Sequence, residues 1–118
     1  MLKCIHIEVY FNICNILQVI PHKKFGSRQE FEAEINKNLL KNDIDIICLA
    51  GFMRILTEKF VIAWRGKMLN IHPSLLPAFK GMDAQKQAFE ARVKITGCTV
   101  HFVSVSGQYF FLIYKSLG

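Results

Sequence analysis

The segment IDIICLA, residues 44–50, contains at residues 46–49 an apolar run without the alternation of a half-exposed strand. A run of this kind is typical of a strand that lies in a parallel sheet with both faces covered. Two further short apolar segments follow along the chain, MLNI at residues 68–71 and CTVHFV at residues 98–103. We therefore expect buried strands over these three segments.

Helical signals precede and separate the expected strands. A serine and a glutamate three residues apart form the pattern of a capping box, and apolar side chains recur every fourth residue after it. These signals predict an amphipathic helix over residues 27–41, and weaker ones predict helices over 58–64 and 83–93. The alternation of helix and strand predicts an α/β fold with a mainly parallel sheet and helices on both faces. Ligands of such sheets bind in the loops that follow the strands.

Composition limits the class of protein. The chain has 118 residues, 52% of them hydrophobic and 20% charged, which fits one globular domain and excludes a disordered polypeptide. The net charge of +6 is spread along the sequence, so we expect no nucleic-acid partner, although a positive surface suits small anionic substrates.

The cysteines and the apolar N-terminal segment could indicate a metal-binding, redox, membrane or secreted protein. The four cysteines form no C-x-x-C pair, so the sequence predicts neither a metal site nor a redox motif. Polar residues interrupt the first twenty residues too often for a membrane helix, and no signal-peptide cleavage pattern follows. We expect a cytoplasmic protein with no membrane partner.

The segment NIHPSLLP, residues 70–77, carries the most chemical information. Asn70 and His72 lie two residues apart in a strand, so their side chains point to the same side of the sheet. The Asn70 amide can donate to a developing oxyanion, and His72 can transfer a proton near neutral pH. A triplet of this kind is weak evidence alone, because a structural histidine would be the commoner explanation.

Longer motifs around this triplet favour a functional explanation over a structural one. The segments CLAGFMRIL (48–56), GKMLNIHPSLLPAFKG (66–81) and GCTVHFV (97–103) resemble the phosphoribosylglycinamide formyltransferase family, also called glycinamide ribonucleotide transformylases. The segment VIPHKKFGSRQEF (19–31) resembles the animal form of that family. The resemblance covers residues 19–103 and implies a Rossmann-like formyltransferase fold, here incomplete.

The resemblance also implies an activity. The family transfers a formyl group from the co-substrate 10-formyltetrahydrofolate to the amine of glycinamide ribonucleotide, a step of purine biosynthesis. Asn70 matches the catalytic residue that holds the tetrahedral oxyanion, and His72 matches the catalytic proton donor. The residues that match the folate-binding positions of the family are Arg28, Met53, Arg54, Ile55, Leu56 and Asn70.

The two ends of the chain depart from the family pattern. The glycine-rich phosphate loop of the family, of G-T-G-S-N type, is absent, and Gln108 stands where the family has an aspartate that acts on the catalytic histidine. We therefore expect a partial formyltransferase domain over residues 19–105, truncated at both ends, with segments 1–18 and 106–118 unlike the family. On its own, such a chain is expected to transfer formyl groups slowly.

Three interpretations of function remain open from the sequence. The chain is a glycinamide ribonucleotide formyltransferase, or a catalytically inactive or misassembled fragment of that enzyme. A related formyltransferase or a formyltetrahydrofolate hydrolase is the third interpretation.

Overall fold

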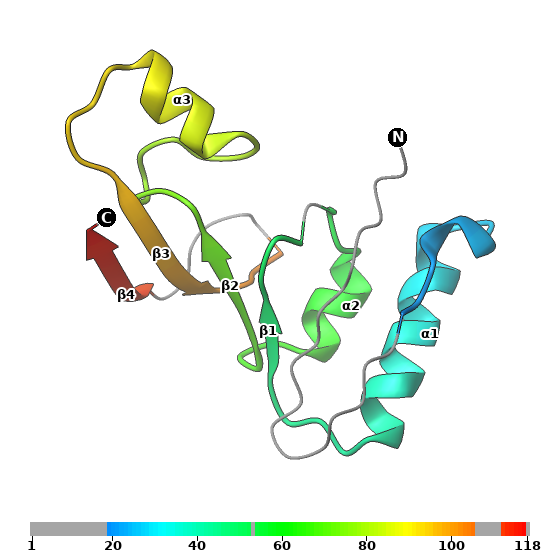
Figure 1. The fold of residues 1–118 in the computed structure, drawn as a ribbon. Helices are drawn as coiled ribbons and strands as arrows, with labels where there is room; N and C mark the ends of the chain where they lie inside the picture. Colours follow the sequence, from blue (N-terminus) through cyan, green and yellow to red (C-terminus); the bar gives the residue numbers. More distant parts are fainter. Residues whose placement is uncertain (1–18, 53, 106–111, 118) are drawn as a thin grey trace.

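The computed structural model describes residues 19–52 and 54–105, together with the backbone of residues 112–117. The sequence predicted three of its helices and three of its strands, and the ends of these elements differ slightly from the prediction. The strand over residues 112–117 was not predicted. Figure 1 shows the elements in chain order: a 3-10 helix η1 (His22–Lys24), α1 (Arg28–Lys41), β1 (Ile47–Leu49), α2 (Glu58–Ala63), β2 (Met68–His72), α3 (Ala84–Glu90), β3 (Gly97–Phe102) and β4 (Leu112–Leu117).

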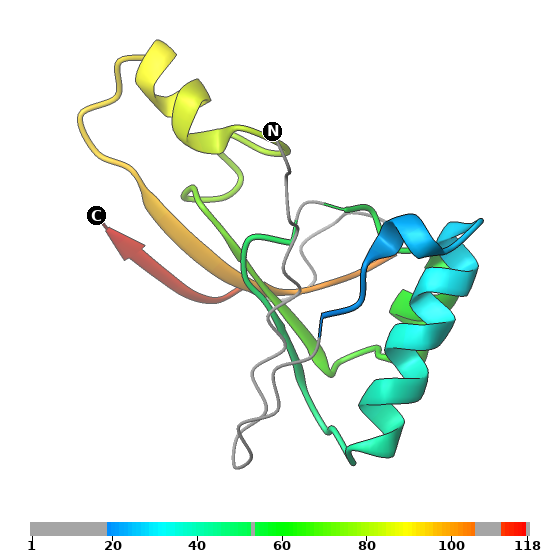
Figure 2. The same cartoon turned by 45° about the vertical axis from the view of Figure 1, so that its right-hand side comes forward.

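The described strands form one mixed sheet in the order β1-β2-β3-β4. Strands β1 and β2 are parallel, whereas β2 with β3 and β3 with β4 are antiparallel. The prediction of a mainly parallel sheet is therefore wrong for the described strands. The reason lies in the connection from β2 to β3, whose helix α3 stands beyond the end of the sheet in Figures 1 and 2. Because this connection does not cross a face of the sheet, the chain re-enters from the end at which it left.

One face of the sheet carries the main hydrophobic core. Ile47 of β1 and Met68 of β2 are cross-strand partners, and both α1 and α2 pack against them. The indole Nε1 of Trp64 donates to Asn36 Oδ1 at 2.8 Å, which joins the two helices on this face. The buried cluster consists of Phe31, Ile35, Leu39, Ile47, Phe60, Val61, Trp64 and Met68.

No described helix covers the opposite face of β1 and β2. Cys48 is exposed, and the side chains of Ile46 and Ile71 are 56% and 48% exposed. The prediction that residues 46–49 are covered on both faces is wrong, and so, for the described helices, is the prediction of helices on both faces. The physical reason is that α1 and α2 bind each other and therefore share one face.

The start of α1 confirms the capping signal in the sequence. Ser27 Oγ accepts a hydrogen bond from the Glu30 amide at 3.1 Å. The Glu30 carboxylate reaches back to the Gly26 amide at 2.9 Å, one residue before the usual partner in a capping box. The first bond satisfies a backbone donor that the first helical turn leaves unpaired, and the second pairs the amide that lies just before the N-cap. Helix α1 therefore begins at a defined residue and holds its core side chains in register.

Candidate functional site

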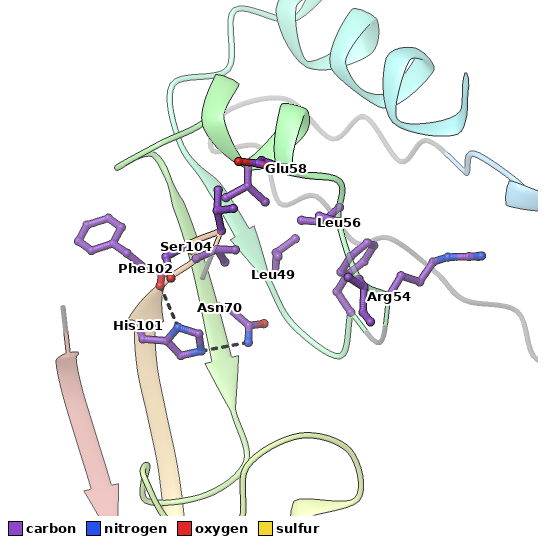
Figure 3. Close-up of a pocket in the computed structure, with 13 residues that line it drawn as sticks. Leu49, Arg54, Leu56, Glu58, Asn70, His101, Phe102 and Ser104 are labelled. Atoms are coloured by element: carbon purple, nitrogen blue, oxygen red, sulfur yellow. Dashed lines mark hydrogen bonds between the residues drawn. The ribbon is translucent and has the colours of Figure 1, made fainter. Parts of the chain in front are cut away.

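A cavity of about 330 Å³ lies where β1 and β2 end, on the face that α2 covers (Figure 3). The two strands are parallel, so their carboxyl ends meet at the same edge of the sheet. This is the place at which α/β sheets bind ligands, and the size suits a small organic molecule. Its lining residues are Leu49, Phe52, Arg54, Ile55, Leu56, Glu58, Val61, Asn70, His101, Phe102, Val103, Ser104 and Val105.

The polar centre of the cavity is a pair formed by Asn70 and His101. The two residues are cross-strand partners on β2 and β3, and Asn70 Nδ2 lies 3.3 Å from His101 Nε2. His101 Nδ1 lies 3.0 Å from the Phe102 carbonyl, which can only accept. The Nδ1 atom therefore carries the proton, and Nε2 accepts from the Asn70 amide. Since an amide has two N–H groups, this bond orients Asn70 and still allows its second N–H to reach a ligand oxygen.

His72 lies on the same face of β2 as Asn70 but does not line the cavity. It is buried, and its Nε2 donates to the Phe79 carbonyl oxygen at 2.9 Å. The expected orientation toward one side of the sheet is therefore present, while the imidazole binds the turn that follows β2. The Nε2 proton of His72 is therefore bound by a backbone carbonyl and not by a group that lines the cavity.

Buried hydroxyl groups hold the turn that carries Phe79. Thr99, next to His72 across the β2–β3 ladder, is fully buried. Its hydroxyl donates to the Ser74 carbonyl at 2.7 Å and accepts from the Leu76 amide at 3.0 Å. The Ser74 hydroxyl donates to the Ala78 carbonyl at 2.6 Å. The position of the His72 partner thus depends on β3.

Replacing Thr99 by valine is expected to lower the free energy of unfolding by about 1–3 kcal/mol. The reason is that the Leu76 amide and the Ser74 carbonyl lose the Thr99 hydroxyl as hydrogen-bond partner. Urea unfolding followed by the fluorescence of Trp64, the single tryptophan, measures this change. Thr96→Val is the matched control, since the buried Thr96 hydroxyl has no hydrogen-bond partner among the described residues. Equal losses in the two variants would contradict the role given to the Thr99 hydroxyl.

The predicted folate-binding loop lies at the cavity, but its residues differ in what they contact. Leu56 is half-buried and Ile55 is exposed, and both line the cavity. Arg54 also lines it, while its guanidinium extends away (Figure 3) and lies 5.6 Å from the centre of the Phe31 ring on α1. Met53 lies outside the described residues. The loop therefore supplies apolar surface to the cavity, and its described cation is directed toward α1.

The site suits a small ligand that is partly apolar and partly polar. Leucine and valine side chains supply apolar contact, whereas Asn70 and His101 supply oriented hydrogen-bonding groups. Among the described residues, no cluster of three or more histidine, cysteine, aspartate or glutamate side chains could hold a metal ion. Within the same residues, no helix is long and apolar enough to cross a membrane.

Comparison with known proteins decides the family. A family model described as formyl transferase matches residues 13–107, which is most of the chain. This chain belongs to the formyl transferase family. The match includes the strands β1, β2 and β3 and the described cavity lining.

Two relatives of this chain have names that describe purine biosynthesis or formyl transfer. The human trifunctional purine biosynthetic protein adenosine-3 is 60% identical over 87 residues, which are 74% of this chain and 9% of that protein. Phosphoribosylglycinamide formyltransferase of Bacillus subtilis (strain 168) is 47% identical over 81 residues, 69% of this chain and 42% of that enzyme. This chain therefore spans less than half the length of either relative.

A solved structure agrees with the fold. Phosphoribosylglycinamide formyltransferase from Brucella melitensis superposes with a TM-score of 0.76 at 40% identity, over 86% of this chain and 52% of that one. This chain therefore has a Rossmann-like α/β fold, as the sequence predicted.

Two residues lie differently from the site that the sequence predicted. Arg28, a predicted folate-binding residue, is exposed at the first position of α1 and does not line the described cavity. His101, by contrast, lines the cavity, although it was not among the predicted site residues. Its alternation within the strand CTVHFV was the available signal, but only the β2–β3 register places it opposite Asn70.

Proposed function

We propose that this chain is part of a phosphoribosylglycinamide formyltransferase and that its cavity binds 10-formyltetrahydrofolate as co-substrate. The single observation that carries this proposal is the cavity at the ends of β1 and β2, in which Asn70 and His101 face an apolar loop. The proposal further rests on 47% identity to the Bacillus subtilis phosphoribosylglycinamide formyltransferase.

The pterin ring of the co-substrate would occupy the apolar part of the cavity. Leu49, Leu56 and Val61 line that part from β1, the following loop and α2. A flat heterocycle buries both of its faces against such side chains, and a few polar groups then set its orientation. Asn70 is the polar group that lies nearest to this surface on β2, which supports its predicted place in the folate site. Arg28 would contact a part of the folate beyond the described cavity.

The chemical step needs an oxyanion donor and a proton donor. The amine of glycinamide ribonucleotide attacks the formyl carbon, the carbonyl oxygen becomes an oxyanion, and the bond from carbon to N10 of the folate then breaks. The Asn70 N–H would stabilise the oxyanion, because an oriented amide is a suitable donor for it. His72 would act as proton donor, so that the proton lost by the amine is balanced by the one gained at N10.

The proposal also includes the bounds of the domain, its substrates and its location in the cell. Residues 19–105 form the partial formyltransferase domain, and the family match over residues 13–107 encloses them. The substrates are two small molecules, glycinamide ribonucleotide and the folate, in the cytoplasm, with neither nucleic acid nor a membrane as partner.

Folate binding tests the proposal directly. Calorimetric titration of the full chain with 5-formyltetrahydrofolate is expected to show weak, saturable binding. Leu56→Asp is expected to weaken it about tenfold or more, because the loss of a buried leucine contact costs about 1.5–3 kcal/mol. Leu40→Asp is the matched control, since Leu40 is exposed on α1. Absence of binding by the wild-type chain, or equal binding by all three proteins, would overturn the folate site.

A further inference from the structure

Glu32 is a buried carboxylate outside the cavity. It lies on α1, with only 4% of its surface exposed, and neighbours the core residue Phe31. Removal of a carboxylate from water is costly unless hydrogen bonds replace its hydration. The partners of Glu32 therefore indicate what this residue is for.

Both carboxylate oxygens of Glu32 bind one residue that is distant in sequence. The Thr57 amide donates to Glu32 Oε1 at 2.8 Å, and the Thr57 hydroxyl donates to Glu32 Oε2. Thr57 is the N-cap of α2, where its oxygen also accepts from the Phe60 amide at 3.4 Å. Hydrogen bonds to an ionised carboxylate are stronger than those between neutral groups. Glu32 thus fixes the point at which the loop from β1 enters α2.

A second contact from α1 reaches the other end of the same segment. The Arg54 guanidinium lies over the ring of Phe31, the residue before Glu32. Arg54 and Thr57 are the two ends of residues 54–57, which we call the cavity loop. Ile55 and Leu56 lie between these ends, and both line the cavity. Two successive residues of α1 therefore hold the cavity loop on either side of its ligand-facing part.

We propose that Glu32 is a positioning residue for the cavity: through Thr57 it holds the cavity loop where Ile55 and Leu56 can contact a ligand. The proposal that this ligand is a folate rests on the proposed function, whereas the positioning of the loop does not. Glu32 touches no ligand itself in this scheme. Because α1 packs against α2, the Glu32 carboxylate holds Thr57 in one place, and Thr57 in turn holds the cavity loop beside the cavity.

The experiment compares variants of the full chain by two measurements. Amide hydrogen exchange without ligand reports the order of residues 54–57, and titration with 5-formyltetrahydrofolate reports affinity. Glu32→Ala removes both acceptors, whereas Glu34→Ala removes a carboxylate of the same helix whose partners, Asn38 and Lys37, also lie on α1. Thr57→Val removes the hydroxyl donor and leaves Glu32 in place, and Thr57→Ser keeps both hydrogen bonds.

We expect Glu32→Ala to speed exchange in residues 54–57 and to weaken binding about tenfold, since bonds to a buried charge are lost. Exchange in β2 and β3 should stay at the wild-type rate, and Glu34→Ala and Thr57→Ser should match the wild type in both measurements. If Glu32→Ala does not fold, the difference between Thr57→Val and Thr57→Ser decides the proposal.

Two results would overturn the positioning role. One is unchanged exchange in residues 54–57 of Glu32→Ala and Thr57→Val. The other is faster exchange throughout the chain, which would show a general role in stability. A wild-type chain that binds no folate would overturn the proposed function instead, and the exchange rates would still decide the role of Glu32.

Discussion

Replacing Asn70 by alanine is expected to lower the turnover of formyl transfer by about 10²- to 10³-fold, the usual cost of removing one oxyanion donor. The Asn70 amide is oriented before a ligand arrives, because His101 accepts one of its hydrogens across the β2–β3 ladder. An oriented donor needs no reorganisation as charge develops on the formyl oxygen. Folate affinity should fall much less than turnover, since the oxyanion forms only in the reaction.

The measurement is a formyl-transfer assay of the full chain with 10-formyltetrahydrofolate and glycinamide ribonucleotide. Variant and wild type are compared as a ratio, because slow transfer is expected from the wild-type chain itself. Asn42→Ala is the matched control, as Asn42 follows α1 and lies outside the cavity lining. An Asn70→Ala variant that keeps the wild-type turnover would contradict the oxyanion role, and so would an equal loss in the control.

The Met68→Ala variant is expected to lose about 2–5 kcal/mol of unfolding free energy, the typical cost of truncating a large core side chain. Met68 is 1% exposed and lies where β1, α1 and α2 meet. Truncation of the Met68 side chain leaves an empty cavity between the sheet and the two helices, and these elements cannot all move in to fill it. Because a small domain has only about 5–15 kcal/mol in total, this loss would remove a large share of the stability of the protein.

A second methionine supplies the control for this prediction. Met82 is 69% exposed, so Met82→Ala should change the stability by less than about 0.5 kcal/mol. Urea unfolding followed by Trp64 fluorescence measures both variants, since Trp64 belongs to the same core cluster as Met68. Similar midpoints for the two variants would show that the cluster around Met68 does not hold the fold together.

The sequence by itself determined the local elements and the family. Serine and glutamate at capping spacing and a four-residue apolar repeat were enough to place α1, because both signals lie within one helix. Short apolar runs located β1, β2 and β3, and the two-residue spacing of Asn70 and His72 put their side chains on one face of β2. The motifs around residues 48–56 and 66–81 were long enough to identify the formyltransferase family.

Only the tertiary structure decided how these elements meet. The hydrogen bond between Asn70 and His101 joins residues that are 31 positions apart in the sequence. The hydrogen bond from the Thr57 amide to Glu32 joins residues that are 25 positions apart. The same holds for the antiparallel β2–β3 pair and for the face at Cys48 that no described helix covers. Strand β4 was also found only in the structure, where it pairs with β3. The physical reason is that local periodicity records which side of an element is apolar, whereas strand direction, register and long-range hydrogen bonds depend on which surfaces pack together.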